Sequence, residues 1–305
     1  MNAAPTVTVV IPVHNRAADL ALCLEALARQ SFPKPQMDIV VVDNGSTDGS
    51  ADTARRGGAR VCVETMRGAA RARNRGVAES AGRLVAFIDS DCVAAPGWLE
   101  ALVAPLLADE GIGFCVGAVE PYSVASALEQ FIHQSGALNQ EKFNQTTRFS
   151  FPFFMTANAA FRSAALEQAM LVDGSDGPFD PATSPAEDAD LCWRVSWAGW
   201  GRQYVPEAVV RHKHRSTLRS FARQIFGYGA GTVHLFAKHR DRFDARAHVE
   251  WKRYYWTLRA TARLLIKGLF LRRQEWDRQV YTLISYWSFA AGRLYGSMKN
   301  RVLFL

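Results

Sequence analysis

Cysteine is scarce in this sequence and long apolar runs are missing, and both absences limit what the protein can be. The chain has 305 residues and five cysteines, which form neither a CxxC pair nor a regular spacing. We therefore expect neither a zinc site nor a disulfide framework. No uncharged apolar stretch reaches the roughly 18 residues of a membrane-spanning helix, and the first residues lack the charged segment of a secretory signal. These absences favour a cytoplasmic protein.

Acidic residues are scarce in the last third of the chain. Residues 211–305 hold 20 basic and 5 acidic residues, a net charge of +15, whereas residues 1–210 hold 16 and 24, a net charge of −8. This imbalance predicts two domains, 1–215 and 216–305, and a polyanionic partner for the second. We expect that partner to be an anionic membrane surface and no nucleic acid, because no nucleic-acid-binding motif accompanies the charge.

Short apolar runs alternate with helical patterns in the first 90 residues. The predicted strands are 6–11, which Pro12 is expected to stop, 37–42, 60–64 and 84–88, and the predicted helices are 19–28, 50–56 and 67–81. This alternation predicts an α/β fold with a mixed, mostly parallel sheet flanked by helices. Open sheets of this kind bind ligands at the carboxyl ends of their strands. Side chains that follow these strands should therefore share one rim.

Two carboxylates, Asp89 and Asp91, follow the buried run 84–88, with the small residue Ser90 between them. Carboxylates are hard oxygen donors, which suit Mg²⁺ or Mn²⁺ carrying phosphate oxygens. A lone Asp-x-Asp is more often a surface turn than a binding site. The pattern predicts a metal-bound diphosphate site if other parts of the rim support it.

A series of further motifs supports a metal-bound diphosphate site. They are, in chain order, residues 9–16, 41–50, 71–76, 87–92, 156–162, 179–180, 187–194 and 206–212. Together they resemble the motifs of the family 2 glycosyltransferases, over roughly residues 5–215. The resemblance implies a Rossmann-like GT-A fold. It also implies a nucleotide-diphosphate sugar donor of the UDP, GDP or dTDP type and transfer with inversion at the sugar carbon.

The resemblance also implies roles for single residues. Asp91 would be the first metal ligand, Asp89 would reach the ribose or the metal through water, and His212 would complete the site, with His214 in reserve. The alternative for either histidine is a solvated residue of a basic loop. The other residues expected at the nucleotide sugar are Pro12, His14, Asn15, Arg16, Asp43, Arg73, Asn74, Ser90 and Asn158. The expected cofactor is Mn²⁺ or Mg²⁺.

An acceptor hydroxyl must lose its proton as it attacks, so a carboxylate base is expected. The resemblance assigns the base to Asp188, with Glu187 binding an acceptor hydroxyl. The alternative is that both residues belong to the acidic first turn of a helix. A single displacement inverts the configuration, and we find no second carboxylate pair that would suggest a glycosyl-enzyme intermediate.

The basic last third has the pattern of amphipathic helices. Trp251, Tyr255, Leu258, Ala262, Leu265 and Leu269 share one helical face, with Arg259, Arg263 and Lys267 beside it. Residues 279–292 form an uncharged, aromatic-rich stretch with basic flanks. We expect a C-terminal basic amphipathic helical extension in which residues 245–305 lie on an anionic membrane surface. The alternative is a helix pair packed on the catalytic domain.

Glycines at positions 227, 229 and 231 predict a flexible, helix-breaking segment near the acceptor. Upstream of them, Arg215, Arg219 and Arg223 form either a site for a lipid diphosphate or a solvated helix face.

These patterns predict a glycosyltransferase of polysaccharide or cell-envelope biosynthesis. It would act on a polyprenyl-diphosphate-linked or other glycan acceptor while bound peripherally to the inner face of the cell membrane, and a homodimer is left open. The alternative is a catalytically silent nucleotide-sugar-binding subunit that scaffolds a membrane assembly complex. The presence of Asp89, Asp91, Asp188 and His212 disfavours this alternative.

Overall fold

The computed structural model describes residues 6–305 except 145, 147–149, 184, 244–247 and 268–271, and the side chains of 253 and 267 are also left aside. Leu269 and the Lys267 side chain therefore lie outside the described residues. The chain forms two compact units. The first takes the described residues of 1–122, 138–146 and 151–213, and the second those of 123–137, 147–150 and 214–305.

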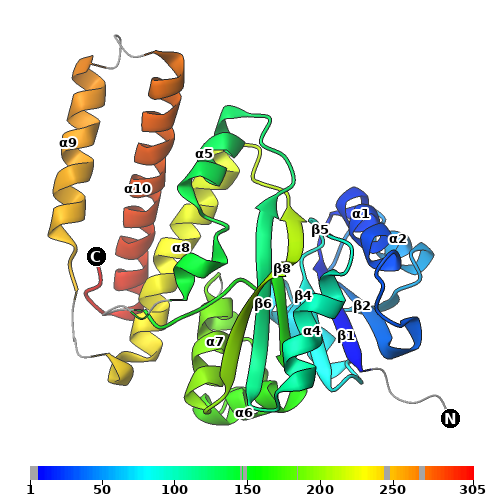
Figure 1. The fold of residues 1–305 in the computed structure, drawn as a ribbon. Coiled ribbons are helices and arrows are strands. Elements are labelled where there is room, and N and C mark those ends of the chain that lie inside the picture. Colours follow the sequence, from blue (N-terminus) through cyan, green and yellow to red (C-terminus); the bar gives the residue numbers. More distant parts are fainter. Residues whose placement is uncertain (1–5, 145, 147–149, 184, 244–247, 268–271) are drawn as a thin grey trace. The chain divides into compact units, whose positions relative to one another are not determined.

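Helices and strands alternate along the first unit, and the second is helical (Figure 1). The strands are β1 (Val7–Val13), β2 (Met37–Asp43), β3 (Arg60–Val63), β4 (Leu84–Ile88), β5 (Cys92–Ala94), β6 (Ile112–Pro121), β7 (Asn158–Arg162) and β8 (Gly201–His212). The helices are α1 (Ala17–Ala28), α2 (Ser50–Arg56), α3 (Ala69–Ala78), α4 (Trp98–Ala108), α5 (Ala127–Ser135), α6 (Ser163–Asp173), α7 (Glu187–Trp197), α8 (Leu218–Lys238), α9 (Trp251–Lys267) and α10 (Arg273–Asn300).

The strands form one mixed sheet in the order β3-β2-β1-β4-β7-β6-β8-β5. The first four strands in this order are parallel, and β7 and β5 run antiparallel to their neighbours. The α/β prediction is therefore confirmed. Pro12, however, does not stop β1, which pairs with β2 as far as Val13. Pairing with β4 has already ended at Val10, so the ring interrupts no hydrogen-bonded ladder on that side.

Both faces of the sheet are buried, as expected for a sheet whose parallel strands are joined by helices. Alternate residues of β1 point to opposite faces: Val9 and Ile11 join the core under α1 and α4, while Val10 joins the core under α3, α6 and α7. Leu20 and Leu27 of α1 lie fully buried against the first of these faces. Because both faces are covered by helices, the strand ends are left for polar chemistry.

The second unit contradicts one prediction about glycine. Gly227, Gly229 and Gly231 lie inside α8, which continues without a break from Leu218 to Lys238. A Cβ atom on Gly229 would come within 2.2 Å of the backbone oxygen of Phe289 in α10. Gly229 therefore allows the two helices to approach closely, and the prediction of a helix-breaking segment is wrong. Among the described residues, no helix combines the length and the apolarity needed to cross a bilayer.

Candidate active site

Asp91 and His212 lie next to each other beyond the carboxyl end of β4. The segment 89–91 follows β4 directly, and Cys92 opens β5, where it pairs with His212 of β8. This register places the Nε2 atom of His212 3.5 Å from a carboxylate oxygen of Asp91. Only 12% of the Asp91 side chain and 16% of the His212 side chain are exposed. Strand pairing thus brings together two residues that are far apart in the sequence.

The donor atoms at this place suit a divalent cation. Ligand atoms of Asp91, Cys92 and His212 lie within 4.8 Å of one another. Burial, with the nearby carboxylates of Asp89 and Asp91, holds the pKa of the Cys92 thiol well above its ordinary value, and Mn²⁺ and Mg²⁺ prefer oxygen ligands to sulfur. The buried Nδ1 atom of His212 has no hydrogen-bond partner within the described part of the chain. A carboxylate and an imidazole remain, and phosphate oxygens could complete such a set.

Arg73 of α3 is the centre of an ion-pair network. Its guanidinium nitrogens lie 2.9 Å from Asp89, 3.1 Å from Glu187 and 3.7 Å from Asp188. Burial disfavours the charge on Arg73, but the three carboxylates outweigh burial and raise its pKa. The partners of Arg73 are thus the acid that follows β4 and the two acids that begin α7. Its place at the nucleotide sugar stays a prediction.

Asp188 is held by Thr156 as well as by Arg73. Thr156 donates two hydrogen bonds to the carboxylate, from its backbone N–H at 3.1 Å and from its hydroxyl at 2.6 Å. Burial raises the pKa of Asp188 although Arg73 and Thr156 both act to lower it, and Asp89 adds to the rise. A carboxylate with a raised pKa exchanges its proton closer to neutral pH, as a general base requires. The sequence alone predicts no role for Thr156, although this residue belongs to one of the motifs.

The first turn of α7 divides its acidic residues between the core and the site. Asp190 forms a fully buried ion pair with Arg194, 2.7 Å away on the next turn. Glu187 and Asp188 instead point to Arg73. The N-cap residue, Ala186, makes no side-chain capping bond. The acidic residues of this turn therefore form ion pairs with Arg73 and Arg194, in addition to any effect on the helix end.

The loops that follow β1 and β2 are hydrogen-bonded to each other. Asn15 has a φ of +52°, a left-handed conformation that asparagine tolerates better than most residues. Its backbone N–H donates to Ser46, and its side-chain oxygen accepts from the N–H of Thr47 at 2.8 Å. Asp43, buried at the end of β2, accepts from the N–H of Ser46 at 3.0 Å. Hydrogen bonds therefore join the loops after β1 and β2 at the predicted rim.

Asp19 of α1 holds two cations beside Asp91. Its carboxylate lies 2.9 Å from Arg16 and also accepts a hydrogen bond from Lys213. Burial acts to raise the pKa of Asp19, but Lys213 and Arg16 outweigh burial and lower it. Arg16 lies 3.8 Å from Asp91 as well, and Lys213 directly follows His212. Asp19 and Lys213 were missed from the sequence, where the only signal was the position of Lys213 next to a candidate ligand.

Two asparagines predicted at the donor make hydrogen bonds within the framework. Asn158 is fully buried; its amide group donates to two backbone carbonyls at 2.8 and 2.7 Å and accepts from the indole of Trp98 at 2.7 Å. Both amide hydrogens of Asn158 are therefore used within the framework, and its role at the donor stays a prediction. Asn74 exchanges two hydrogen bonds, of 2.7 and 2.8 Å, with the backbone of Phe179. Its side chain therefore positions the segment before α7.

The remaining predicted residues lie around this rim or at its border. Pro12 lies inside β1, and Ser90 is buried between the two aspartates. His14 contacts Arg67, which precedes α3. His214 lies at the start of a segment of the second unit. Among the described residues, the group of candidate metal ligands contains His212 and not His214.

Comparison with known proteins places this geometry in a family context. Pre-mycofactocin glycosyltransferase of Mycobacterium tuberculosis (strain CDC 1551 / Oshkosh) is 32% identical over 253 residues, which are 77% of this chain and 48% of that protein. The chain therefore spans about half the length of that relative. Glycosyltransferase AglE of Haloferax volcanii is 27% identical over 248 residues, 79% of this chain and 77% of that protein.

Solved structures show the same fold. Mannosyltransferase PcManGT from Pyrobaculum calidifontis, in complex with GDP-Man and Mn²⁺, has a TM-score of 0.64 at 22% identity and covers 96% of this chain and 88% of its own. Glucosyl-3-phosphoglycerate synthase from M. tuberculosis, in complex with phosphoglyceric acid, has a TM-score of 0.51 at 22% identity, with 80% and 83% covered. The family described as glycosyl transferase family 2 matches residues 8–169, more than half of the chain. The chain belongs to glycosyl transferase family 2.

Proposed function

We propose that the protein transfers a sugar from a nucleotide-diphosphate donor to an acceptor hydroxyl in a single displacement that inverts the sugar carbon. One observation carries this proposal: Arg73 joins Asp89, beside the candidate cation site, to Asp188, the candidate base. These two contacts would connect the part of the site where the diphosphate leaves with the part where the hydroxyl attacks.

The donor end would consist of Asp91 and His212 around a divalent cation, Mn²⁺ or Mg²⁺. The fit rests on their 3.5 Å approach and on the buried ring nitrogen of His212 described above. When bound, the cation would neutralise charge on the departing diphosphate. Arg16 and Lys213 lie at the same place and are candidates for the phosphate oxygens, since Arg and Lys both bind phosphate. The GDP-Man and Mn²⁺ found in PcManGT support this class of donor and cofactor.

The acceptor end would consist of Asp188, with Glu187 beside it. As the hydroxyl oxygen attacks the sugar carbon, its proton would pass to a carboxylate oxygen of Asp188. The two hydrogen bonds from Thr156 fix the orientation of that carboxylate. Arg73 would keep Asp188 ionised before the transfer, because a nearby positive charge favours the charged form of a carboxyl group.

The nature of the acceptor and the place of action form the second part of the proposal. We infer a lipid-linked, polyprenyl-diphosphate type or other glycan acceptor, reached at the inner face of the cell membrane through residues 245–305. The net charge of +15 in residues 211–305 supports an anionic surface as partner. The scaffold alternative is not favoured, because a silent binding subunit has no need for a carboxylate oriented as Asp188 is.

Donor binding provides the test. Wild type and Asp91→Ala are titrated calorimetrically with UDP-, GDP- and dTDP-sugars, in Mn²⁺ and in EDTA. We expect one donor to bind the wild type in Mn²⁺, and its affinity to fall at least about tenfold in EDTA or in the variant, in line with the cost of removing a charged hydrogen-bond or metal partner.

The matched control is Asp52→Ala, which removes an equivalent carboxylate from an exposed ion pair on α2. This variant should bind the donor like the wild type. Failure of the wild type to bind any donor in the panel would overturn the proposal. Metal-independent binding would remove Asp91 and His212 from the role of metal ligands.

A further inference from the structure

The outer face of α9 is apolar although it is exposed. Trp251 is 75% exposed, Tyr255 57%, Leu258 58% and Leu265 80%. These residues, with Ala262, follow one another at intervals of three or four, so they form a single stripe along the helix. We call these five residues the α9 stripe. A helix of a water-soluble unit normally turns such a stripe toward its core.

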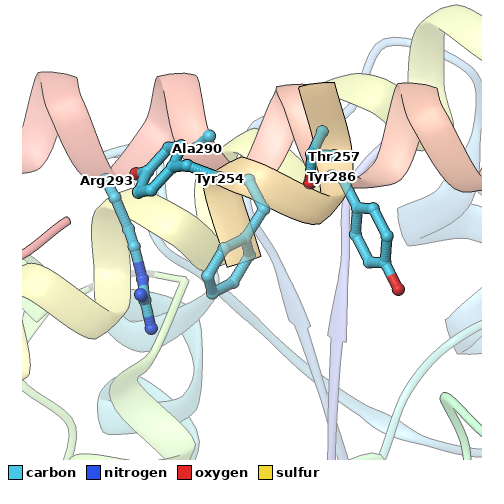
Figure 2. Close-up of a pocket in the computed structure, with 6 residues that line it drawn as sticks. Tyr254, Thr257, Tyr286, Ala290 and Arg293 are labelled. Atoms are coloured by element: carbon cyan, nitrogen blue, oxygen red, sulfur yellow. The ribbon is translucent and has the colours of Figure 1, made fainter. Parts of the chain in front are cut away.

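A different face of α9 contacts α10. Thr257 is 4% exposed, and the hydroxyl of Thr261 accepts a hydrogen bond from the indole of Trp287 in α10 at 3.1 Å. A cavity of about 10 Å³ lies on this seam, lined by Tyr254, Thr257, Tyr286, Phe289, Ala290 and Arg293 (Figure 2). It has room for no more than about one water molecule and is no ligand site. The helix therefore packs through a face that carries hydroxyl groups and exposes its apolar one.

Cations border the α9 stripe. Residues 251–267 contain five basic residues and no acidic one. Lys252, Arg259 and Arg263 are exposed, and the guanidinium of Arg259 lies 5.4 Å from the ring centre of Trp256. An apolar stripe with Trp and Tyr and a purely cationic border matches a surface that is anionic at its boundary and apolar beneath.

We propose that α9 lies in the plane of an anionic lipid bilayer, with the α9 stripe among the acyl chains and Lys252, Arg259 and Arg263 at the headgroups. A second copy of the chain is a poorer occupant, because pairing two such helices would bring cations of the same sign together. Nucleic acid would meet the cations and leave the stripe unused. With 17 residues, α9 is about 25 Å long, which gives the protein an extended line of attachment.

This inference rests on the membrane association proposed above and is independent of the transfer chemistry. It names the element and the face that meet the bilayer. The neighbouring helix α10 would then stand between α9 and α8 within the second unit, as the packing of these helices shows (Figure 1).

Vesicle sedimentation provides the test. The stripe variant combines Leu258→Gln and Leu265→Gln, and the matched control is Leu171→Gln, which changes a leucine that is 82% exposed on α6. Vesicles of phosphatidylglycerol and phosphatidylcholine are compared with vesicles of phosphatidylcholine alone. We expect wild type and control to bind the anionic vesicles and the stripe variant to lose at least about tenfold in partitioning, since burial of a few CH₂ groups controls such binding.

A charge variant tests the border of the stripe. Arg259→Gln combined with Arg263→Gln should reduce binding to anionic vesicles at low salt, while Arg55→Gln combined with Arg56→Gln on α2 should not. Quenching by brominated phosphatidylglycerol adds a measurement of insertion: replacement of Trp251, the tryptophan of the α9 stripe, by Phe should reduce the quenching.

Three outcomes would overturn the inference. In the first, the stripe variant binds vesicles like the wild type. In the second, quenching is unchanged when Trp251 is replaced. In the third, the wild type does not bind vesicles and forms a dimer that is lost in the stripe variant. This result would assign the stripe to contact with a second copy of the chain. Donor titration of the same preparations keeps the two proposals apart: a protein that binds vesicles but no donor would overturn the transfer reaction and leave α9 at the membrane.

Discussion

Arg73 controls the charge of Asp188 from a position that is itself buried. Three carboxylates surround its guanidinium, and only 7% of the side chain is exposed. Loss of its charge would remove the strongest influence that keeps Asp188 ionised. Because the pKa of Asp188 is already raised, it would rise further, and this proposed base would be protonated up to a higher pH.

We therefore expect Arg73→Gln to move the acid limb of the pH profile of kcat to higher pH, as measured by donor turnover from about pH 5 to 9. Breaking a buried ion-pair network costs about 3–5 kcal/mol of stability, so folding is followed by circular dichroism. Arg73→Lys keeps the charge and should retain an acid limb close to that of the wild type. An unshifted limb in a folded Gln variant would contradict this role for Arg73.

Asp188 and Asp190 lie two residues apart in α7 and are expected to respond in opposite ways to the same change. Asp188→Asn removes proton acceptance and should lower kcat by about 10²–10⁴ while donor affinity is kept. Asp190→Asn breaks the fully buried pair with Arg194 and should cost about 3 kcal/mol in the free energy of unfolding, with little change in kcat per folded molecule. Normal turnover by Asp188→Asn would exclude it as the base.

At the scale of elements, the contact between α8 and α10 depends on glycine. A Cβ atom on Gly292 of α10 would come within 2.0 Å of the backbone oxygen of Phe226 in α8. A Cβ atom on Gly229 of α8 would likewise come within 2.2 Å of the backbone oxygen of Phe289 in α10. The two helix backbones approach too closely for a side chain to fit between them, much as small residues allow helices to approach in other packed pairs.

We expect Gly292→Ala to destabilise the protein by about 1–3 kcal/mol, although alanine is intrinsically the better helix former. Urea unfolding followed by circular dichroism measures the change. The control, Ala291→Val, enlarges a neighbouring exposed side chain of the same helix and should stay within about 0.5 kcal/mol of the wild type. A stabilised Gly292→Ala protein would show that propensity outweighs the close approach.

At the scale of the whole molecule, charge and chemistry are divided along the chain. The carboxylates of the candidate active site belong to residues 1–210, whose net charge is −8, while the basic residues gather in 211–305. Such a division makes the basic residues available to an anionic surface. The acidic residues are then available for cation binding and proton acceptance. The structure assigns these two sets to separate compact units, except that Arg211 and Lys213, at the start of the basic range, belong to the first unit.

Much of the first unit was predictable from the sequence. Strand and helix patterns placed 37–42, 60–64 and 84–88 close to the observed β2, β3 and β4, because apolar periodicity reflects burial on one or both faces. The rule that parallel strands present their carboxyl ends at one edge brought Asp43, Asp89 and Asp91 to a common rim. Both arguments need only local sequence and a general property of α/β sheets.

The partners of the polar residues were not predictable in this way. Arg73 meets Glu187 and Asp188, more than a hundred positions further along the chain, and a motif carries no information about which distant groups satisfy a buried charge. Asn158 lies in a motif of the resemblance, yet the hydrogen bonds that its side chain makes go to Trp98 and to two backbone carbonyls of the framework. A buried amide must be hydrogen-bonded, but only the packed chain shows by which groups.

By itself, then, the sequence determined the alternating architecture, the family, the order of the acidic motifs and the helical stripe of residues 251–265. Only the tertiary structure decided that Asp91 pairs with His212, that Arg73 connects both ends of the site, and that α9 turns its apolar stripe outward. The physical reason is the same in each case. Periodicity and composition act over a few residues, whereas a side chain's partners and the face that a helix buries depend on which distant elements pack against it.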